Sequence, residues 1–343
     1  MKVSICLPTF NSIRFLSDRL DSIVGQSYAD WELIVVDSGS IDGTVQTVDE
    51  LIAQDDRVRL IQTPRDGIYP NFNRGIAHAN GDLVHIATSD DTMARDFLEK
   101  MVRALDANCD CDIAHCPMRV FNVDGVDGIN WWHQQSMFAR SSGSLINERH
   151  KRIAPLDGVL CLLGDNVYSS VTQMLVRKTL FEKVGCYESS WGSLGDFHWN
   201  LRAGLVANTI HVPDTWGGWR MHPEQATASV QIGSMGHQLL INQMIADVLD
   251  RLDLFLEKRE QVEICGKFVP QARELRDYRG EYEGYSTVLQ RRVFMIRQLV
   301  DGRMVAWRHL RALLGGGRHW LRDSPQLAAS WFDDDVLVPL GLV

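Results

Sequence analysis

The feature that most constrains the fold is a regular alternation of strand-like and helix-like segments over the first part of the chain. Short apolar, β-branched runs predict strands, and apolar residues spaced three to four positions apart predict helices between them. The predicted strands are 3–7, 33–36, 58–62 and 83–87, and the predicted helices are 13–24, 44–53 and 72–79. Strands that alternate with helices form a parallel sheet with crossover helices, so we predict an α/β fold.

Acidic residues follow two of these predicted strands. Asp37 comes after the second strand, and Asp90 and Asp91 come after the fourth. Parallel sheets bind ligands at the carboxyl ends of their strands, where both turns are expected to lie. Adjacent carboxylates repel each other unless a cation or hydrogen bonds compensate, and hard oxygen ligands suit Mg²⁺ or Mn²⁺. The alternative is that Ser89 or Asp90 only caps the next helix.

The second half of the chain is less regular. A length of 343 residues has room for one large α/β domain and an appendage. Residues 239–260 have the pattern of one long amphipathic helix, and further helical patterns follow. We predict an α/β domain over 1–232 and a mainly helical extension over 233–343.

Charge and composition restrict the partners and the compartment. The net charge of -9 disfavours nucleic acid, because phosphate binding depends on clustered Lys and Arg. Seven scattered cysteines fit reduced thiols better than a disulfide framework. The sequence begins without the layout of a signal peptide, and no run approaches the ~20 apolar residues of a spanning helix. We therefore expect a cytoplasmic protein.

Several motifs between Cys6 and Asp91 carry a family resemblance. They are Cys6-Leu7-Pro8-Thr9-Phe10-Asn11, the run from Trp31 to Thr44, the run from Asp66 to Ile76, Gly81-Asp82 and Ser89-Asp90-Asp91. In this order and spacing they resemble the family 2 glycosyltransferases, in particular those of bacterial polysaccharide biosynthesis. The resemblance implies a GT-A fold, which is a Rossmann-like nucleotide-diphospho-sugar transferase domain. It also implies a nucleotide-diphospho-sugar donor, a Mn²⁺ or Mg²⁺ cofactor and inversion at the anomeric carbon.

The same resemblance assigns roles to residues of the first hundred positions. Asp91 would be the direct metal ligand, and Thr88 stands where many relatives have a further acid, which leaves open which carboxylate faces the ribose and which the metal. The nucleotide-binding residues would be Pro8, Thr9, Asn11, Asp37, Asp66, Asn73 and Asp90.

Two later segments resemble the catalytic elements of that family. Residues 191–202 resemble its acidic segment, with Gly195 in place of the usual Glu and Asp196 retained as the catalytic base. A base is needed because an inverting transfer deprotonates the acceptor hydroxyl as it attacks. Arg220 would neutralise the leaving diphosphate, and His222 would complete the metal shell. The alternatives without a catalytic role are a helix cap for Asp196, a surface ion pair for Arg220 and a structural imidazole for His222.

The acceptor side is the least determined part. Trp131, Trp132 and Asp165 lie where family members bind acceptors, although paired tryptophans are also ordinary core residues. Eight arginines interleaved with apolar residues over 288–323 form a basic amphipathic pattern. That pattern fits contact with the inner face of a membrane or packing on protein, including a second subunit.

These features predict metal-dependent transfer of a sugar from a nucleotide-diphospho-sugar to a saccharide or lipid-linked saccharide, with UDP as the expected nucleotide. One alternative is a catalytically silent nucleotide-binding scaffold subunit, which Gly195 supports. Another is a sugar nucleotidyltransferase, which normally has a Gly-rich basic loop after the first strand. This chain has Pro8-Thr9-Phe10-Asn11 at that place.

Overall fold

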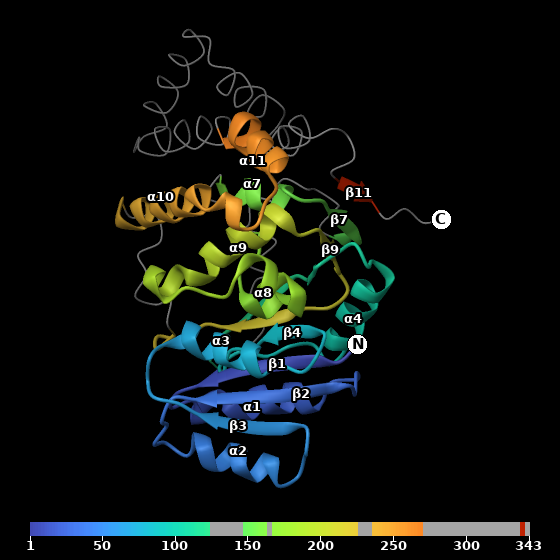
Figure 1. Ribbon diagram of the computed structural model, residues 1–343. Helices are drawn as coiled ribbons and strands as arrows, with labels where there is room; N and C mark the ends of the chain where they lie inside the picture. The colour runs from blue at the N-terminus through green and yellow to red at the C-terminus, as the bar shows by residue number, and fades with distance from the viewer. Residues whose placement is uncertain (124–146, 163–166, 226–234, 270–336, 340–343) are drawn as a thin grey trace, which may run out of the picture.

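The computed structural model describes residues 1–123, 147–162, 167–225, 235–269 and 337–339. Its centre is a mixed β-sheet whose strands lie in the order β11-β7-β9-β5-β8-β4-β1-β2-β3 (Figure 1). A second, two-stranded sheet pairs β6 with β10 in parallel. The strands of both sheets are β1 (Val3–Thr9), β2 (Trp31–Asp37), β3 (Val58–Gln62), β4 (Leu83–Ile86), β5 (Ile113–His115), β6 (Met118–Phe121), β7 (His150–Arg152), β8 (Met174–Arg177), β9 (Thr209–His211), β10 (Gly217–Arg220) and β11 (Leu337–Pro339).

Helices cover both faces of the large sheet. They are α1 (Ile13–Val24), α2 (Thr44–Ile52), α3 (Ile68–His78), α4 (Phe97–Ala107), α7 (Leu156–Leu162), α8 (Lys178–Val184), α9 (Gly195–Val206), α10 (Met235–Asp250) and α11 (Lys258–Glu263). Alternate residues of a strand point to opposite faces. In β1, Ile5 packs with α1 and α4 on one face, and Cys6 packs with α3 on the other. Both faces of β1 are therefore apolar, as expected of a central parallel strand.

A third apolar cluster joins α7 and α9 to the helices that follow residue 234. Met244 and Val248 of α10 are completely buried there, against residues such as Leu201 of α9. Helices α7 and α9 cross where Gly158 meets Gly204, and a Cβ on Gly204 would lie 2.5 Å from the backbone nitrogen of Gly158. The two helices therefore approach more closely than side chains would allow. In Figure 1, α10 lies beside α9 and α7.

The α/β fold expected from the sequence is confirmed. Strands β1, β2, β3 and β4 are parallel to one another and match the predicted runs to within two residues at each end. Helix α3 begins four residues earlier than predicted, at Ile68, because Pro70 lies in its first turn, where a missing N–H costs no helical hydrogen bond.

One expectation was wrong, and one part of the sheet was not predicted. Strand β8, for which the sequence analysis made no prediction, is antiparallel to both of its neighbours, β4 and β5. The helix predicted over 239–260 is broken after Asp250, because Leu252 and Leu256 turn into the third cluster before Glu257 caps α11. The domain boundary predicted at residue 232 falls outside the described residues and stays a prediction.

Candidate active site

The ends of β1 and β2 meet at the carboxyl edge of the sheet. Thr9 and Asp37 are partners in the parallel register, and the Thr9 hydroxyl donates to Asp37 Oδ2 at 2.8 Å. The Asp37 side chain is completely buried and also accepts from the Ser40 hydroxyl and from the backbone N–H groups of Gly39 and Ser40. Asp37 thus holds the loop after β2 in place. Its predicted contact with a base or ribose stays a prediction.

Asn11 connects the loops after β1 and β2. Its backbone N–H donates to the Ser40 hydroxyl at 2.8 Å, and its side-chain oxygen accepts from the N–H of Ile41 at 3.0 Å. Its φ of 48° is in the left-handed region, which Asn tolerates better than most residues. Pro8 is buried in β1 opposite Val36. The structure therefore brings Pro8, Thr9, Asn11 and Asp37 together at the ends of β1 and β2, and their predicted contact with a nucleotide stays a prediction.

Asp66 and Asn73 belong to the segment around α3, but their side chains contact protein. Asp66 forms a two-pronged ion pair with Arg74, with one contact at 2.7 Å, and the hydrogen bonds from Arg74 hold the pKa of Asp66 below its usual range. The Asn73 amide donates to the carbonyl of Tyr187 at 2.8 Å and accepts from its N–H at 3.0 Å. Asn73 therefore fixes the segment before Asp196, and its predicted role near the nucleotide stays a prediction.

The acidic turn after β4 contacts the segment that follows β10. Asp90 Oδ2 lies 2.9 Å from His222 Nε2, and the Asp90 side chain is 27% exposed while that of His222 is 7% exposed. The other ring nitrogen of His222 is buried without a hydrogen-bond partner among the described residues. A carboxylate oxygen and an imidazole nitrogen held at this distance are suitable ligands for one Mn²⁺ ion.

Asp91, the neighbouring carboxylate, points into the protein and is 2% exposed. Its Oδ1 accepts from the backbone N–H of Arg220 at 2.8 Å, and its Oδ2 accepts from the Thr88 hydroxyl. Burial, together with the adjacent Asp90, raises the pKa of Asp91 above its ordinary range. The geometry therefore favours Asp90 over Asp91 as the partner of His222, and direct ligation by Asp91 stays a prediction.

Arg220 is occupied by contacts within the protein. Its guanidinium donates to Asp18 of α1 at 2.8 Å and to the backbone carbonyl of Asp90 at 2.9 Å, and it lies 4.9 Å from the ring centroid of Phe15. The same Phe15 ring packs 4.9 Å from the ring of His222. Arg220 thus ties α1 to the acidic turn, and its predicted contact with a diphosphate stays a prediction.

Arg19 is a buried cation near the acidic turn that the sequence analysis missed. Its Nη2 lies 3.1 Å from His85 Nε2, while His85 Nδ1 lies 2.9 Å from the carbonyl of Met174. Burial lowers the pKa of His85 to about 3, so the neutral ring donates from Nδ1 and accepts at Nε2. Burial lowers the pKa of Arg19 to about 10, against the opposing attraction of Asp91 and Asp90. Arg19 therefore supplies positive charge beneath the two carboxylates.

Asp196 lies at the start of α9, where Tyr69 of α3 holds it. The Asp196 N–H donates to the Tyr69 hydroxyl at 3.1 Å, and that hydroxyl lies 3.4 Å from Asp196 Oδ1. Oδ1 also accepts from the N–H of Phe197 at 2.8 Å, so within the described residues Oδ2 remains for another donor. Burial raises the pKa of Asp196. A partly buried carboxylate of raised pKa with one uncommitted oxygen suits a general base.

The structure accounts for Gly195, the departure from the family pattern. A Cβ at this position would lie 2.6 Å from the Glu188 carbonyl oxygen and 2.7 Å from Cε2 of Tyr69. No side chain fits there unless Tyr69 or the Glu188 backbone moves. Close packing around Asp196 therefore leaves no room for the usual Glu at position 195, and the role of Asp196 as the base stays a prediction.

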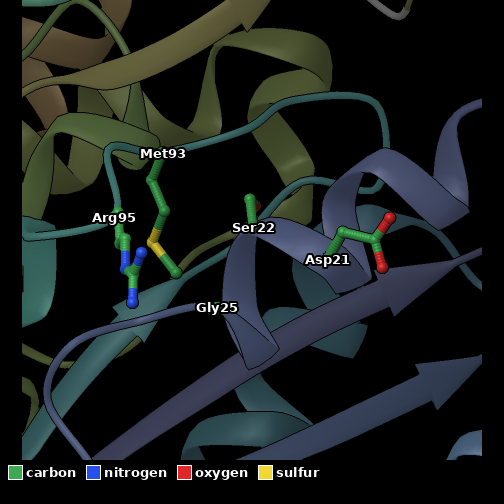
Figure 2. Close-up of a pocket in the computed structure, with 5 residues that line it drawn as sticks. All are labelled: Asp21, Ser22, Gly25, Met93 and Arg95. Atoms are coloured by element: carbon green, nitrogen blue, oxygen red, sulfur yellow. The ribbon is translucent and has the colours of Figure 1, made fainter.

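A separate pocket lies against the C-terminal turn of α1. Its volume is about 450 Å³, and Figure 2 shows its lining residues, which are Asp21, Ser22, Gly25, Met93 and Arg95. None of the predicted site residues that the structure describes is among its lining residues. Trp131, Trp132 and Asp165, predicted on the acceptor side, lie outside the described residues.

The family follows from a comparison with known proteins. Residues 4–185, more than half of the chain, match the profile described as Glycosyl transferase family 2. The chain belongs to this family of transferases. Glycosyltransferase GlyG of Streptococcus pneumoniae is 30% identical over 127 residues, which are 37% of this chain and 41% of GlyG. The chain spans less than half the length of several curated relatives that it matches.

Solved structures support the GT-A fold. S. aureus TarS 1–349 in complex with UDP-GlcNAc has a TM-score of 0.61 at 19% identity and covers 96% of this chain and 92% of that one. The mannosyltransferase PcManGT from Pyrobaculum calidifontis, in complex with GDP-Man and Mn²⁺, has a TM-score of 0.53 at 17% identity and covers 96% and 84%. Among the described residues, no helix is long and apolar enough to cross a membrane.

Proposed function

We propose that this chain is an inverting, metal-dependent glycosyltransferase whose catalytic base is Asp196. The observation that carries the proposal is the position of this carboxylate. Tyr69, which holds it, lies in the first turn of α3, directly after β3 leaves the sheet at its carboxyl edge. Asp90 follows β4, which runs parallel to β3 in the same sheet. The base and the acidic turn thus lie at one edge, where α/β proteins bind ligands.

Asp90 and His222 are the residues we propose to hold the metal. The donor set fits Mn²⁺ because it combines a carboxylate oxygen with an imidazole nitrogen already 2.9 Å apart. When bound, such an ion neutralises the negative charge that develops on the departing diphosphate. Asp91 and Arg220 position this pair, since Asp91 accepts from the Arg220 backbone and the Arg220 guanidinium binds the Asp90 carbonyl.

Asp196 acts on the acceptor. Its free oxygen accepts the proton of the acceptor hydroxyl as that oxygen forms its bond to the anomeric carbon and the bond to the diphosphate breaks. Attack from the face opposite the leaving group inverts the anomeric configuration. The raised pKa of Asp196 brings the carboxylate closer to the proton affinity needed at neutral pH.

The donor and the setting are further parts of the proposal. The UDP-GlcNAc bound by S. aureus TarS supports a UDP-linked donor, and the GDP-Man bound by PcManGT makes GDP-sugars the first alternative. We place the reaction in surface polysaccharide biosynthesis at the cytoplasmic side of the membrane, with a saccharide or lipid-linked saccharide as acceptor. The family membership supports this placement.

The test is release of nucleoside diphosphate from UDP-, GDP- and dTDP-sugars, with and without Mn²⁺. We expect Mn²⁺-dependent turnover of one donor. Asp196→Asn should lower the turnover number by about 10² to 10⁴ because it removes the general base. Asp90→Asn should abolish the Mn²⁺ dependence of donor binding. The exposed Asp253→Asn variant is the matched control and should behave like the wild type.

Two results would contradict the proposal. Full turnover in Asp196→Asn would show that this carboxylate is not the base. No turnover together with no Mn²⁺-dependent binding of any nucleotide would favour the silent scaffold subunit. The anomeric configuration of the product, measured by NMR from one-bond C–H couplings, tests inversion separately.

A further inference from the structure

A cluster of charged side chains joins α10 to the segment that carries Asp196. It consists of Glu188, His198, Arg202, Asp247 and Arg251 and is called here the charged bridge. Glu188 precedes α9, His198 and Arg202 belong to α9, and Asp247 and Arg251 come from α10 and the turn after it. His198 is completely buried, whereas Glu188, Asp247 and Arg251 have side-chain exposures of about 30%.

Arg251 is the centre of this bridge. Its Nη2 lies 3.1 Å from Glu188 Oε1 and 3.2 Å from His198 Nε2, and it donates to Asp247 Oδ2. His198 Nε2 lies 2.8 Å from the same Asp247 oxygen. One guanidinium thus contacts three side chains that come from both sides of the boundary between α9 and α10.

Three of these side chains have the geometry of a metal site, but the guanidinium of Arg251 already supplies the positive charge there. The ligand atoms of Glu188, His198 and Asp247 lie within 4.8 Å of one another. Arg251 occupies the position between them, and Arg202 approaches Glu188 Oε1 at 3.8 Å. Two carboxylates are therefore balanced by two guanidiniums. Burial lowers the pKa of His198, which keeps the imidazole neutral and fits donation from Nε2 to Asp247.

Residues of the charged bridge lie close to Asp196 in the sequence and pack against its neighbours. The Glu188 carbonyl packs directly against Gly195, the residue before the base. His198 lies two residues after the base, and the Trp191 ring packs 5.0 Å from the His198 ring. Arg202 also donates to the backbone carbonyls of Val184, the last residue of α8, and Cys186, near the start of the segment that leads to Asp196.

We propose that Arg251 is a positioning residue for the glycosyl transfer, through which α10 holds the 185–198 segment and its base in their working geometry. This inference rests on the proposed function, because it assigns Asp196 the role of base. It gives the helical part after residue 234 a task in catalysis besides packing. Within the described part of the chain, the polar side-chain contacts of Arg251 are with Glu188, His198 and Asp247, none of which is assigned to the donor.

The test compares Arg251→Met with Arg259→Met, an exposed arginine of α11 that undergoes the same chemical change. We expect Arg251→Met to lower kcat about tenfold or more, since small displacements of a base are costly, while the KM for the donor stays within about twofold. Arg259→Met should leave both unchanged. Arg251→Lys, which keeps the positive charge, should recover part of the lost kcat.

Amide hydrogen exchange tests, without relying on activity, whether Arg251 holds residues 185–198 in place. Arg251→Met should speed exchange over residues 185–198 and leave β1 to β4 unchanged. Unchanged exchange in that segment, or a uniform increase over the whole chain, would overturn the proposal. Faster local exchange with an unchanged kcat would also overturn it, because the contacts of Arg251 would then stabilise the segment without contributing to catalysis. A wild-type chain with no turnover and no Mn²⁺-dependent binding of any nucleotide would instead refute the proposed function. The exchange result would still decide whether Arg251 holds residues 185–198 in place.

Discussion

Replacing Gly195 by Ala is the sharpest test of how Asp196 is held. The added Cβ would lie 2.6 Å from the Glu188 carbonyl oxygen, about 0.8 Å inside the 3.4 Å at which ordinary contact begins. It would also meet the Tyr69 ring at 2.7 Å. Relief requires moving either the Glu188 backbone or the ring whose hydroxyl binds Asp196. Both movements displace the base by an appreciable fraction of an ångström.

The expected effects follow from that displacement. Overpacking of a well-packed site costs about 1 to 3 kcal/mol, so the melting temperature should fall by several degrees. A misplacement of about 1 Å can reduce a catalytic rate about 10²-fold, so kcat should fall between about tenfold and 10²-fold. The KM for the donor should change little, because neither Glu188 nor Tyr69 is among the residues assigned to the nucleotide.

The assay measures nucleoside diphosphate release and thermal unfolding in parallel. Gly266→Ala is the matched control, because no heavy atom lies within 4 Å of a Cβ at that position. It should keep full activity and unfold at the wild-type temperature or slightly above it. Gly195→Glu, which restores the usual family residue, should be worse than Gly195→Ala. A gain of activity in Gly195→Glu would refute the packing described around Asp196.

Three further predictions concern other parts of the chain. Arg19→Met should lower the free energy of unfolding by about 1 to 3 kcal/mol, because it leaves His85 Nε2 without its donor and buried Asp91 without a nearby cation. Adding His85→Leu to the same chain should recover part of this loss, as measured by urea unfolding. His85 has a pKa of about 3 in the folded protein and about 6.5 in the unfolded chain. Its contribution to the free energy of unfolding is therefore complete above pH 6.5 and is lost as the pH falls, by up to about 1.4 kcal/mol per pH unit. Urea midpoints should fall more steeply between pH 6.5 and 5 in the wild type than in His85→Gln. If residues 288–323 contact a membrane, the full chain should co-sediment with anionic vesicles at low salt and not with neutral ones.

Much of the α/β half could be predicted from the sequence because its signals are local. Strands β1 and β2 are buried along their whole length and consist mainly of apolar residues, and α1 has its apolar residues on one helical stripe. Acidic residues directly after such strands must lie at the carboxyl edge, whatever the rest of the chain does. Strand β8 could not be placed in the same way, because its antiparallel pairing with β4 and β5 joins residues far apart in the chain.

The roles of adjacent charged residues could not be predicted, because distant partners decide them. Asp90 and Asp91 are neighbours, yet the inward direction of Asp91 depends on the N–H of Arg220, 129 residues later. Arg19 did carry a signal, since it falls on the apolar stripe of α1 between Leu16 and Ile23. That signal identifies a buried cation only once its partner, His85, is known from the structure.

The two halves of the proposed site are supported by different elements, and this has a consequence for how the activity can vary. The acidic turn is held by α1 and the end of β10, through Asp18 and Arg220. The base is held by Tyr69 of α3 and, through the charged bridge, by α10. No described hydrogen bond or ion pair links one set of supports to the other. Apolar packing does join them, because Trp219 of β10 packs against the cluster that contains Met244 and Val248 of α10. We therefore expect polar changes in the charged bridge to act on the base first, and changes in the apolar face of α10 to affect both halves of the site.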